Sequence, residues 1–164
     1  MGATPEEEKR REAMQLFEKA YEHQMRGELD EAVELYQRSI ALYPTAEGHT
    51  FLGWTYSYQG RIEEAIQECL KAIEVDPTFG NPYNDIGAYL IELGRLDEAI
   101  PWLERALRAP RYESYCFPHY NLGRVYETRR SFAKALEHFR MALAENPQHV
   151  GARQAVQRLV AMQN

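Results

Sequence analysis

The histidines, cysteines and clustered charges are the side chains with which this chain could do chemistry, but their spacing is not that of a catalytic or metal centre. Its histidines are His23, His49, His119, His138 and His149. None is spaced from another as zinc ligands are, and no Cys-x-x-Cys pair accompanies them. No glycine-rich phosphate loop occurs either. We therefore expect no enzymatic activity, no cofactor and no metal site.

The charged clusters have structural interpretations. The acid pairs Glu63-Glu64 and Asp97-Glu98 stand where helices begin, and carboxylates there interact favourably with the helix dipole. Arg105, Arg108 and Arg111 are spaced for one helix face and its end. They form either a solvated surface or a site that attracts an acidic partner.

Composition indicates a folded protein with an acidic surface. The 164 residues are 45% hydrophobic and 27% charged, with a formal net charge of −6. Because nucleic acids and anionic membranes bind basic surfaces, neither is expected as a partner. The N-terminal stretch lacks the apolar segment of a secretory signal, and no apolar run is long enough for a transmembrane helix. We expect a cytoplasmic location.

Turn residues divide the chain into pairs of helices. Thr4 and Pro5 predict the first helix start, with Glu7 placed as the acid of a capping box. The turns within the first three pairs fall at Gly27, Gly60 and Gly94. The four pairs end at Pro44, Pro77, Pro110 and Pro147. A last helix, about residues 148–162, is apolar on one side only.

Small residues recur in these pairs with a period near 34. One set lies in the first helix of each pair and two lie in the second: Ala20, Gly53, Gly87 and Gly123; Ala32, Ala65, Ala99 and Ala135; Ser39, Ala72, Ala106 and Ala142. This order resembles the tetratricopeptide repeat (TPR) family. Cys69 falls at a large-residue core position of that pattern, which predicts a buried side chain.

The resemblance implies an all-α, right-handed α-solenoid of four TPR hairpins plus a C-terminal capping helix. We expect a single domain over 1–164, with repeats at about 13–45, 46–79, 80–113 and 116–147. The capping helix would take about 148–162, and residues 1–12 would extend the first helix. The fourth repeat departs from the pattern, because Arg130 occupies its turn position where the others have glycine. His49 and His119 occupy equivalent sites, where half-buried packing residues are expected.

The resemblance also implies a concave groove lined by the first helix of each pair. Spacing along those helices selects the candidate peptide-binding residues: Phe17, Tyr21, Thr50, Trp54, Asn81, Asn84, Ala88, Phe117, Tyr120 and Arg124. Exposed aromatic residues with an arginine are typical of binding hot spots. The alternative is that the aromatic residues pack against neighbouring helices.

The predicted function is a non-enzymatic protein-interaction adaptor, a monomer or weak homo-oligomer, that binds a peptide segment in the groove. The alternative is a structural subunit that self-associates or docks through its convex face. One group of TPR proteins binds chaperone tails ending in Glu-Glu-Val-Asp through lysine, asparagine and arginine side chains. The corresponding positions lack that set in either register, and one of them is Asp85. We therefore expect no binding of such a tail.

Overall fold

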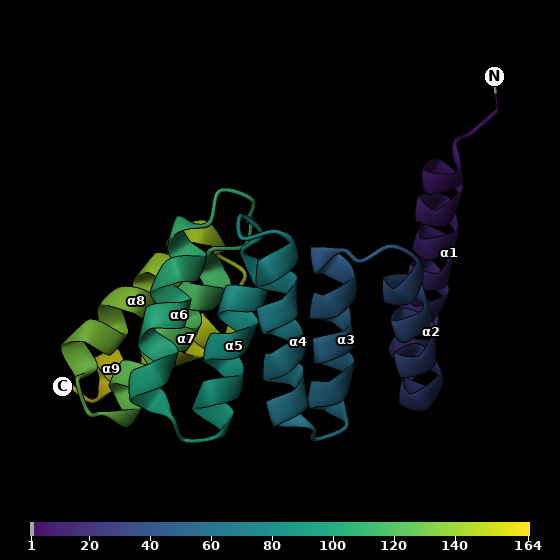
Figure 1. The fold of residues 1–164 in the computed structure, drawn as a ribbon. Helices are drawn as coiled ribbons and strands as arrows, with labels where there is room; N and C mark the ends of the chain where they lie inside the picture. Colours follow the sequence, from purple (N-terminus) through teal and green to yellow (C-terminus); the bar gives the residue numbers. More distant parts are fainter. Residues whose placement is uncertain (1) are drawn as a thin grey trace. The chain divides into compact units, whose positions relative to one another are not determined.

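The computed structural model describes residues 2–164, which form nine α-helices and no β-strand (Figure 1). Short turns join eight of them into four hairpins, and the ninth follows the last hairpin. The helices are α1 Pro5–Met25, α2 Leu29–Leu42, α3 Ala46–Tyr58, α4 Ile62–Val75, α5 Asn81–Glu92, α6 Leu96–Arg108, α7 Cys116–Thr128, α8 Phe132–Glu145 and α9 Val150–Ala161. This architecture confirms the predicted all-α TPR solenoid class.

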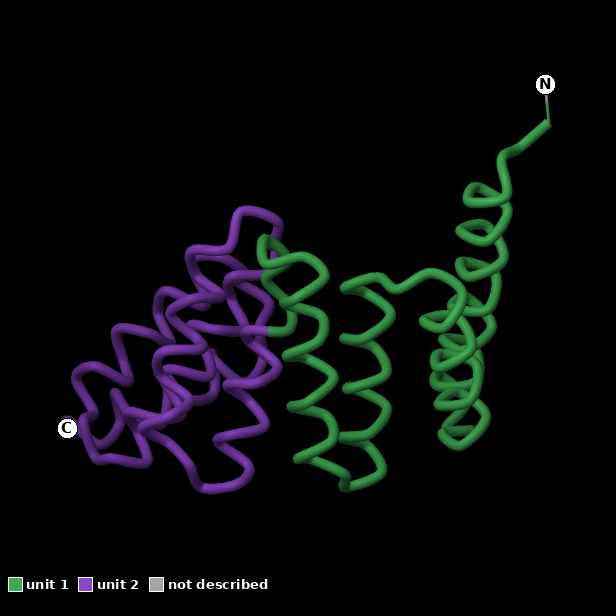
Figure 2. The backbone as a smooth tube through the Cα atoms, in the orientation of Figure 1, with its two compact units in different colours: residues 1–82 green, residues 83–164 purple. Residues whose placement is uncertain are grey.

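The chain divides into two compact units, residues 1–82 and residues 83–164 (Figure 2). In unit 1, α2 packs between α1 and α3, α4 packs on α3, and α1 also touches α3. In unit 2, α7 packs between α6 and α8, and α9 packs on α8. These helices therefore pack mainly against their neighbours in the sequence, as expected for stacked repeats.

The small residues of the pattern lie where two helices meet most closely. Ala32, Ala65, Ala99 and Ala135 are all 0% exposed. Gly123 of α7 lies against the Phe139 ring of α8, and a Cβ on Gly123 would come within 2.5 Å of Cε1 of that ring. The repeating small residues are thus required by the distance between the helices of each hairpin.

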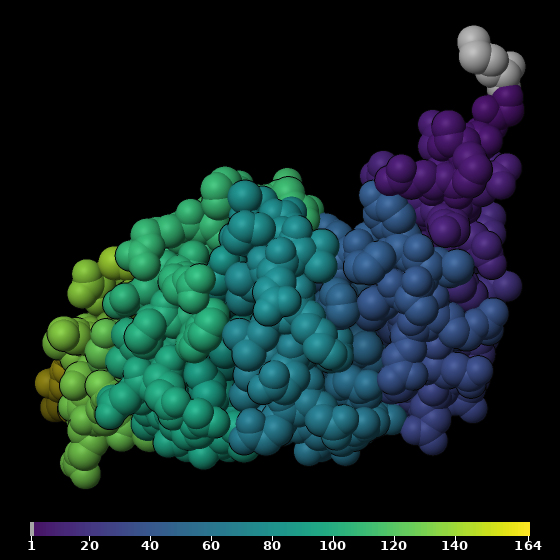
Figure 3. Space-filling model, viewed as in Figure 1, coloured from purple at the N-terminus to yellow at the C-terminus, as the bar shows by residue number. Residues whose placement is uncertain are grey.

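The first helix begins as its sequence predicts. Thr4 accepts a hydrogen bond from the Glu7 backbone N–H, and its own N–H donates to the Glu7 carboxylate at 2.6 Å. This reciprocal pair is a capping box. Residues 2–12 are exposed, and the first turns of α1 stand clear of the rest of unit 1 (purple in Figure 3).

The hairpin turns need a backbone with positive φ. Gly27, Gly60 and Gly94 have φ of 77°, 77° and 74°, and Arg130 adopts the same conformation with φ of 62°. An arginine in this region carries a steric cost that glycine does not. The fourth hairpin therefore keeps the turn geometry of the others despite its different residue.

We expect Arg130→Gly to stabilise the protein by about 0.5–1 kcal/mol, because it relieves the left-handed strain at that turn. Urea denaturation gives the free energy of unfolding. Gly60→Ala is the control: it places a side chain at the same φ in hairpin two and should destabilise by a similar amount. A loss of stability in Arg130→Gly would mean that the arginine side chain makes a contact worth more than the strain.

Candidate functional site

Five rings on α1 and α3 form the aromatic face of unit 1, with Phe51 at its centre. The Phe51 ring lies edge-to-face against three others, with centroid distances of 5.1 Å to Phe17, 5.9 Å to Tyr21 and 5.7 Å to Trp54. Trp54 in turn packs on Tyr58 at 5.5 Å. Edge-to-face pairs hold rings in defined orientations, so this surface is largely pre-organised.

The outer rings of the aromatic face remain open to solvent. Tyr21 is 40% exposed, Trp54 36% and Tyr58 60%, while Phe17 and Phe51 are half-buried beneath them. The aromatic residues therefore pack against one another and still present apolar surface. Large rings held at a surface lose little side-chain entropy on binding, which suits them to anchor a partner.

A pocket of about 410 Å³ adjoins this face at the N-terminal end of unit 1. Its lining combines apolar side chains with a few charged and hydroxyl groups: Arg10, Ala13, Met14, Phe17, Glu18, Ser39, Tyr43, Thr45 and Glu47. Because Phe17 belongs to both surfaces, the pocket and the aromatic face are continuous. The pocket is large enough to take one or two side chains of a bound segment.

Three predicted groove residues of unit 2 form a second surface on α7. Phe117 is 46% exposed, and its ring lies 5.7 Å from that of His149. Tyr120 packs closer to the same imidazole, at 4.6 Å between centroids. Arg124 follows one turn later and lies 6.0 Å from the Tyr120 ring.

A hydrogen-bonded chain connects α7 to α5 within unit 2. Arg124 donates from Nη1 to Oδ1 of Asn121 (3.2 Å), and Asn121 donates from Nδ2 to Oδ1 of Asn84 (3.0 Å). The guanidinium is thereby oriented before any partner arrives. Asn84 also bonds the neighbouring Asp85. Burial raises the pKa of Asp85 to about 7, although the bond from Asn84 acts in the opposite direction.

The structure separates the ten predicted groove residues into groups. Phe17, Tyr21 and Trp54 meet in unit 1, and Asn84 and Arg124 are joined through Asn121 in unit 2. The remaining first-helix residues differ in exposure. Thr50 is buried and donates its hydroxyl to the Ala46 carbonyl, whereas the other two candidates are half-buried: Asn81 and Ala88.

Three residues of these surfaces were absent from the sequence-based set: Phe51, Tyr58 and Asn121. Phe51 lies one helical turn from Trp54, and Tyr58 lies one turn further on. Phe51 and Tyr58 are aromatic and fit helical spacing from Trp54, so the sequence contained a signal for both, but the predicted set followed Thr50 and Trp54 instead.

Two facing positions, one on each helix of a hairpin, hold different side chains in hairpins two and four. Hairpin two has His49, whose Nδ1 lies 2.7 Å from Oε2 of Glu68. Lys71 also bonds that carboxylate, at 2.9 Å. Burial raises the pKa of Glu68, but these bonds outweigh it and the net pKa is lowered. The equivalent pair in hairpin four is His119 and His138, with Nδ1 atoms 3.4 Å apart.

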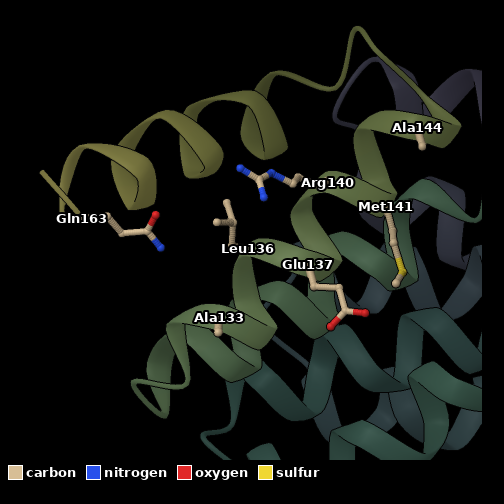
Figure 4. A pocket seen from close by; sticks show the side chains of 7 residues that line it. All are labelled: Ala133, Leu136, Glu137, Arg140, Met141, Ala144 and Gln163. Atoms are coloured by element: carbon tan, nitrogen blue, oxygen red, sulfur yellow. The ribbon is translucent and has the colours of Figure 1, made fainter.

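A shallow pocket of about 560 Å³ lies on α8, beside the end of α9 (Figure 4). Apolar, charged and amide side chains line it: Ala133, Leu136, Glu137, Arg140, Met141, Ala144 and Gln163. It belongs to a second helix, so it is the kind of surface that the alternative function would use.

Over residues 2–164, no helix is long and apolar enough to cross a membrane.

Four helical hairpins with open aromatic surfaces define a repeat scaffold for protein–protein interaction. Three models of the tetratricopeptide repeat match the chain, over residues 18–50, 46–79 and 79–144. The chain belongs to the TPR family.

Known proteins resemble the chain mainly in fold. A TPR repeat-containing thioredoxin of Arabidopsis thaliana, TTL4, is 31% identical over 75 residues, which are 45% of this chain and 11% of that protein. The chain thus spans only a small part of that relative. The structure of Pseudomonas aeruginosa PilF superposes with a TM-score of 0.86 at 23% identity, covering 98% of this chain and 71% of PilF. The structure of the first TPR of Spaghetti (RPAP3), bound to the HSP90 peptide SRMEEVD, superposes with a TM-score of 0.65 at 19% identity. The match covers 72% of this chain and 92% of that one.

Proposed function

We propose that this protein is a non-catalytic interaction module that binds an extended peptide segment of a partner protein along its first helices. The aromatic face of unit 1 is the observation that carries the proposal. Three large side chains stay exposed there at fixed orientations, beside a pocket sized for side chains: Tyr21, Trp54 and Tyr58. A TPR neighbour bound to a peptide supports the same mode of action.

The aromatic face of unit 1 offers apolar contacts, and Arg124 of unit 2 separately offers a polar one. Ring surfaces contribute mainly through burial of apolar area, about 25 cal/mol per Å² removed from water. Arg124 is already held by Asn121, so it can donate to a carbonyl or carboxylate of the segment without losing much freedom. A segment that binds the aromatic face therefore needs a large apolar side chain, and a segment that binds α7 needs an acceptor group.

We expect Trp54→Ala with Arg124→Ala to lose the partner while helical content and melting temperature stay nearly unchanged. Both side chains are partly open to solvent, so their truncation leaves the small-residue contacts between helices intact. Affinity capture from the native lysate followed by mass spectrometry identifies the partner. Overlapping synthetic peptides of it are then titrated against a Trp102→Phe protein, whose fluorescence reports Trp54 alone.

The matched control removes a similar pair from second helices. Val75→Ala with Arg140→Ala truncates an exposed apolar residue on α4 and an exposed arginine on α8. The proposal requires that this control captures the partner and binds its peptide as the wild type does. Loss in the control with retention in Trp54→Ala/Arg124→Ala would overturn it and favour docking through the second helices.

A further inference from the structure

Two imidazoles face each other across hairpin four. Nδ1 of His119 on α7 lies 3.4 Å from Nδ1 of His138 on α8, and the ring centroids are 5.7 Å apart. The centroids thus lie farther apart than the nitrogens, so the two nitrogens point inward between the rings. Both rings are half-buried, and His138 stacks on Tyr126 with a centroid distance of 5.5 Å. Packing therefore restricts the pair while leaving it within reach of solvent.

The other hairpins hold different side chains at the two equivalent positions, one on each helix. These two positions hold Leu16 and Leu35 in hairpin one. In hairpin three they hold Tyr83 and Trp102, whose rings are tilted with centroids 6.2 Å apart and both lie beneath the Arg105 guanidinium. In hairpin two, His49 has a carboxylate partner, so its Nδ1 is satisfied. In hairpin four, by contrast, two Nδ1 atoms face each other. If both imidazoles are neutral, they can share a hydrogen bond only when one Nδ1 carries a proton and the other does not.

We propose that His119 and His138 form a two-histidine site for a divalent transition-metal ion of the zinc class, bound through both Nδ1 atoms. Two nitrogens at roughly 2.0–2.1 Å from a tetrahedral zinc ion lie about 3.3–3.4 Å from each other. The separation in the structure is 3.4 Å. No cluster of three or more metal-binding side chains occurs in residues 2–164, so water fills the remaining coordination positions.

The electrostatic surroundings of the pair suit a cation. Burial lowers the pKa of both histidines, which keeps the imidazoles neutral and able to bind a metal at neutral pH. The carboxylates of Glu137 and Glu104 act on His138, and that of Glu145 acts on His119. Lys134 is the cation that opposes them at His138. The negative groups thus outnumber the positive one around the site.

The test is a titration of the full chain, free of any histidine tag, with Zn²⁺ at pH 7.5. We expect one equivalent to bind with a micromolar dissociation constant and to raise the melting temperature. His119→Gln and His138→Gln should each weaken binding at least tenfold, since glutamine keeps a polar side chain of similar size but not the imidazole nitrogen. His23→Gln, which removes a half-buried histidine paired with Glu28, is the control and should leave binding unchanged.

Nitrogen chemical shifts of the wild-type imidazoles give a second measurement that does not depend on a variant folding correctly. One equivalent of zinc should change the Nδ1 chemical shifts of both His119 and His138. The nitrogen chemical shifts of His49 should not change. Binding that affects neither ring, or that survives both glutamine variants, would refute the site. Zinc that binds only at millimolar concentration would also refute it, as adventitious surface binding.

Discussion

Phe139→Ala should lower the free energy of unfolding of unit 2 by about 3–5 kcal/mol, the range for removing a fully buried aromatic ring. Phe139 is 0% exposed. Its ring contacts Gly123 and Tyr120 on α7 and belongs to the core that α9 closes through Leu159. The site cannot collapse easily, because helices on both sides are fixed by their own packing.

Fluorescence separates the units in this experiment. Trp54 lies in unit 1 and Trp102 in unit 2, and the chain contains no other tryptophan. In a Trp54→Phe background, urea denaturation followed by fluorescence therefore reports unit 2. Phe117→Ala is the control, because this phenylalanine of α7 is 46% exposed. Its removal should lower the free energy of unfolding much less than removal of the buried Phe139 ring. Equal losses in the two variants would contradict the assigned core.

The contact between Gly123 and Phe139 adds a stricter test of the same packing. Gly123→Ala alone should destabilise by about 1–3 kcal/mol, because its Cβ would overlap the ring. In a Phe139→Ala background the added methyl group meets a cavity instead, so its cost should vanish. Simple addition of the two losses would show that the residues are not in contact.

Much of the fold was predictable, because the small residues that set helix separation recur at fixed positions. Ala65 and Gly87 could be identified from sequence, since only a small side chain suits a close helix contact. The left-handed turn at Arg130 was suggested by its alignment with three glycines, and the structure shows the same positive φ. The hairpin geometry determines that conformation more strongly than the residue does.

The candidate site was less predictable, because its geometry depends on pairs of helices. Helical spacing placed Trp54 on a first helix, but the role of Phe51 emerges only when α1 and α3 are packed together. His119 and His138 are 19 positions apart, so no spacing rule for metal ligands connects them. The exclusion of a Glu-Glu-Val-Asp tail stays a prediction. Its argument from Asp85 is weaker, because this residue is half-buried and its pKa is raised to about 7.

Asp85 should make the stability of unit 2 fall as pH rises. Burial holds its pKa at about 7 in the folded chain, against an ordinary value of 3.8. Between these values the folded state retains a proton that the unfolded state has released, so stability is greatest below about pH 4 and declines until about pH 7. At about 1.4 kcal/mol per pKa unit, the full decline is at most about 4 kcal/mol.

We therefore expect Asp85→Asn to be more stable than the wild type by about 2–4 kcal/mol at pH 8 and nearly equal to it at pH 4. Asparagine keeps the size and one acceptor for the bond with Asn84 but carries no charge to bury. Urea denaturation at both pH values, read through Trp102, measures the difference. Glu113→Gln neutralises an exposed acid of unit 2 and should show a small, pH-independent effect. A variant that loses stability at pH 8 would mean that the Asp85 carboxylate is ionised and stabilising in the fold, with Asn84 as its donor.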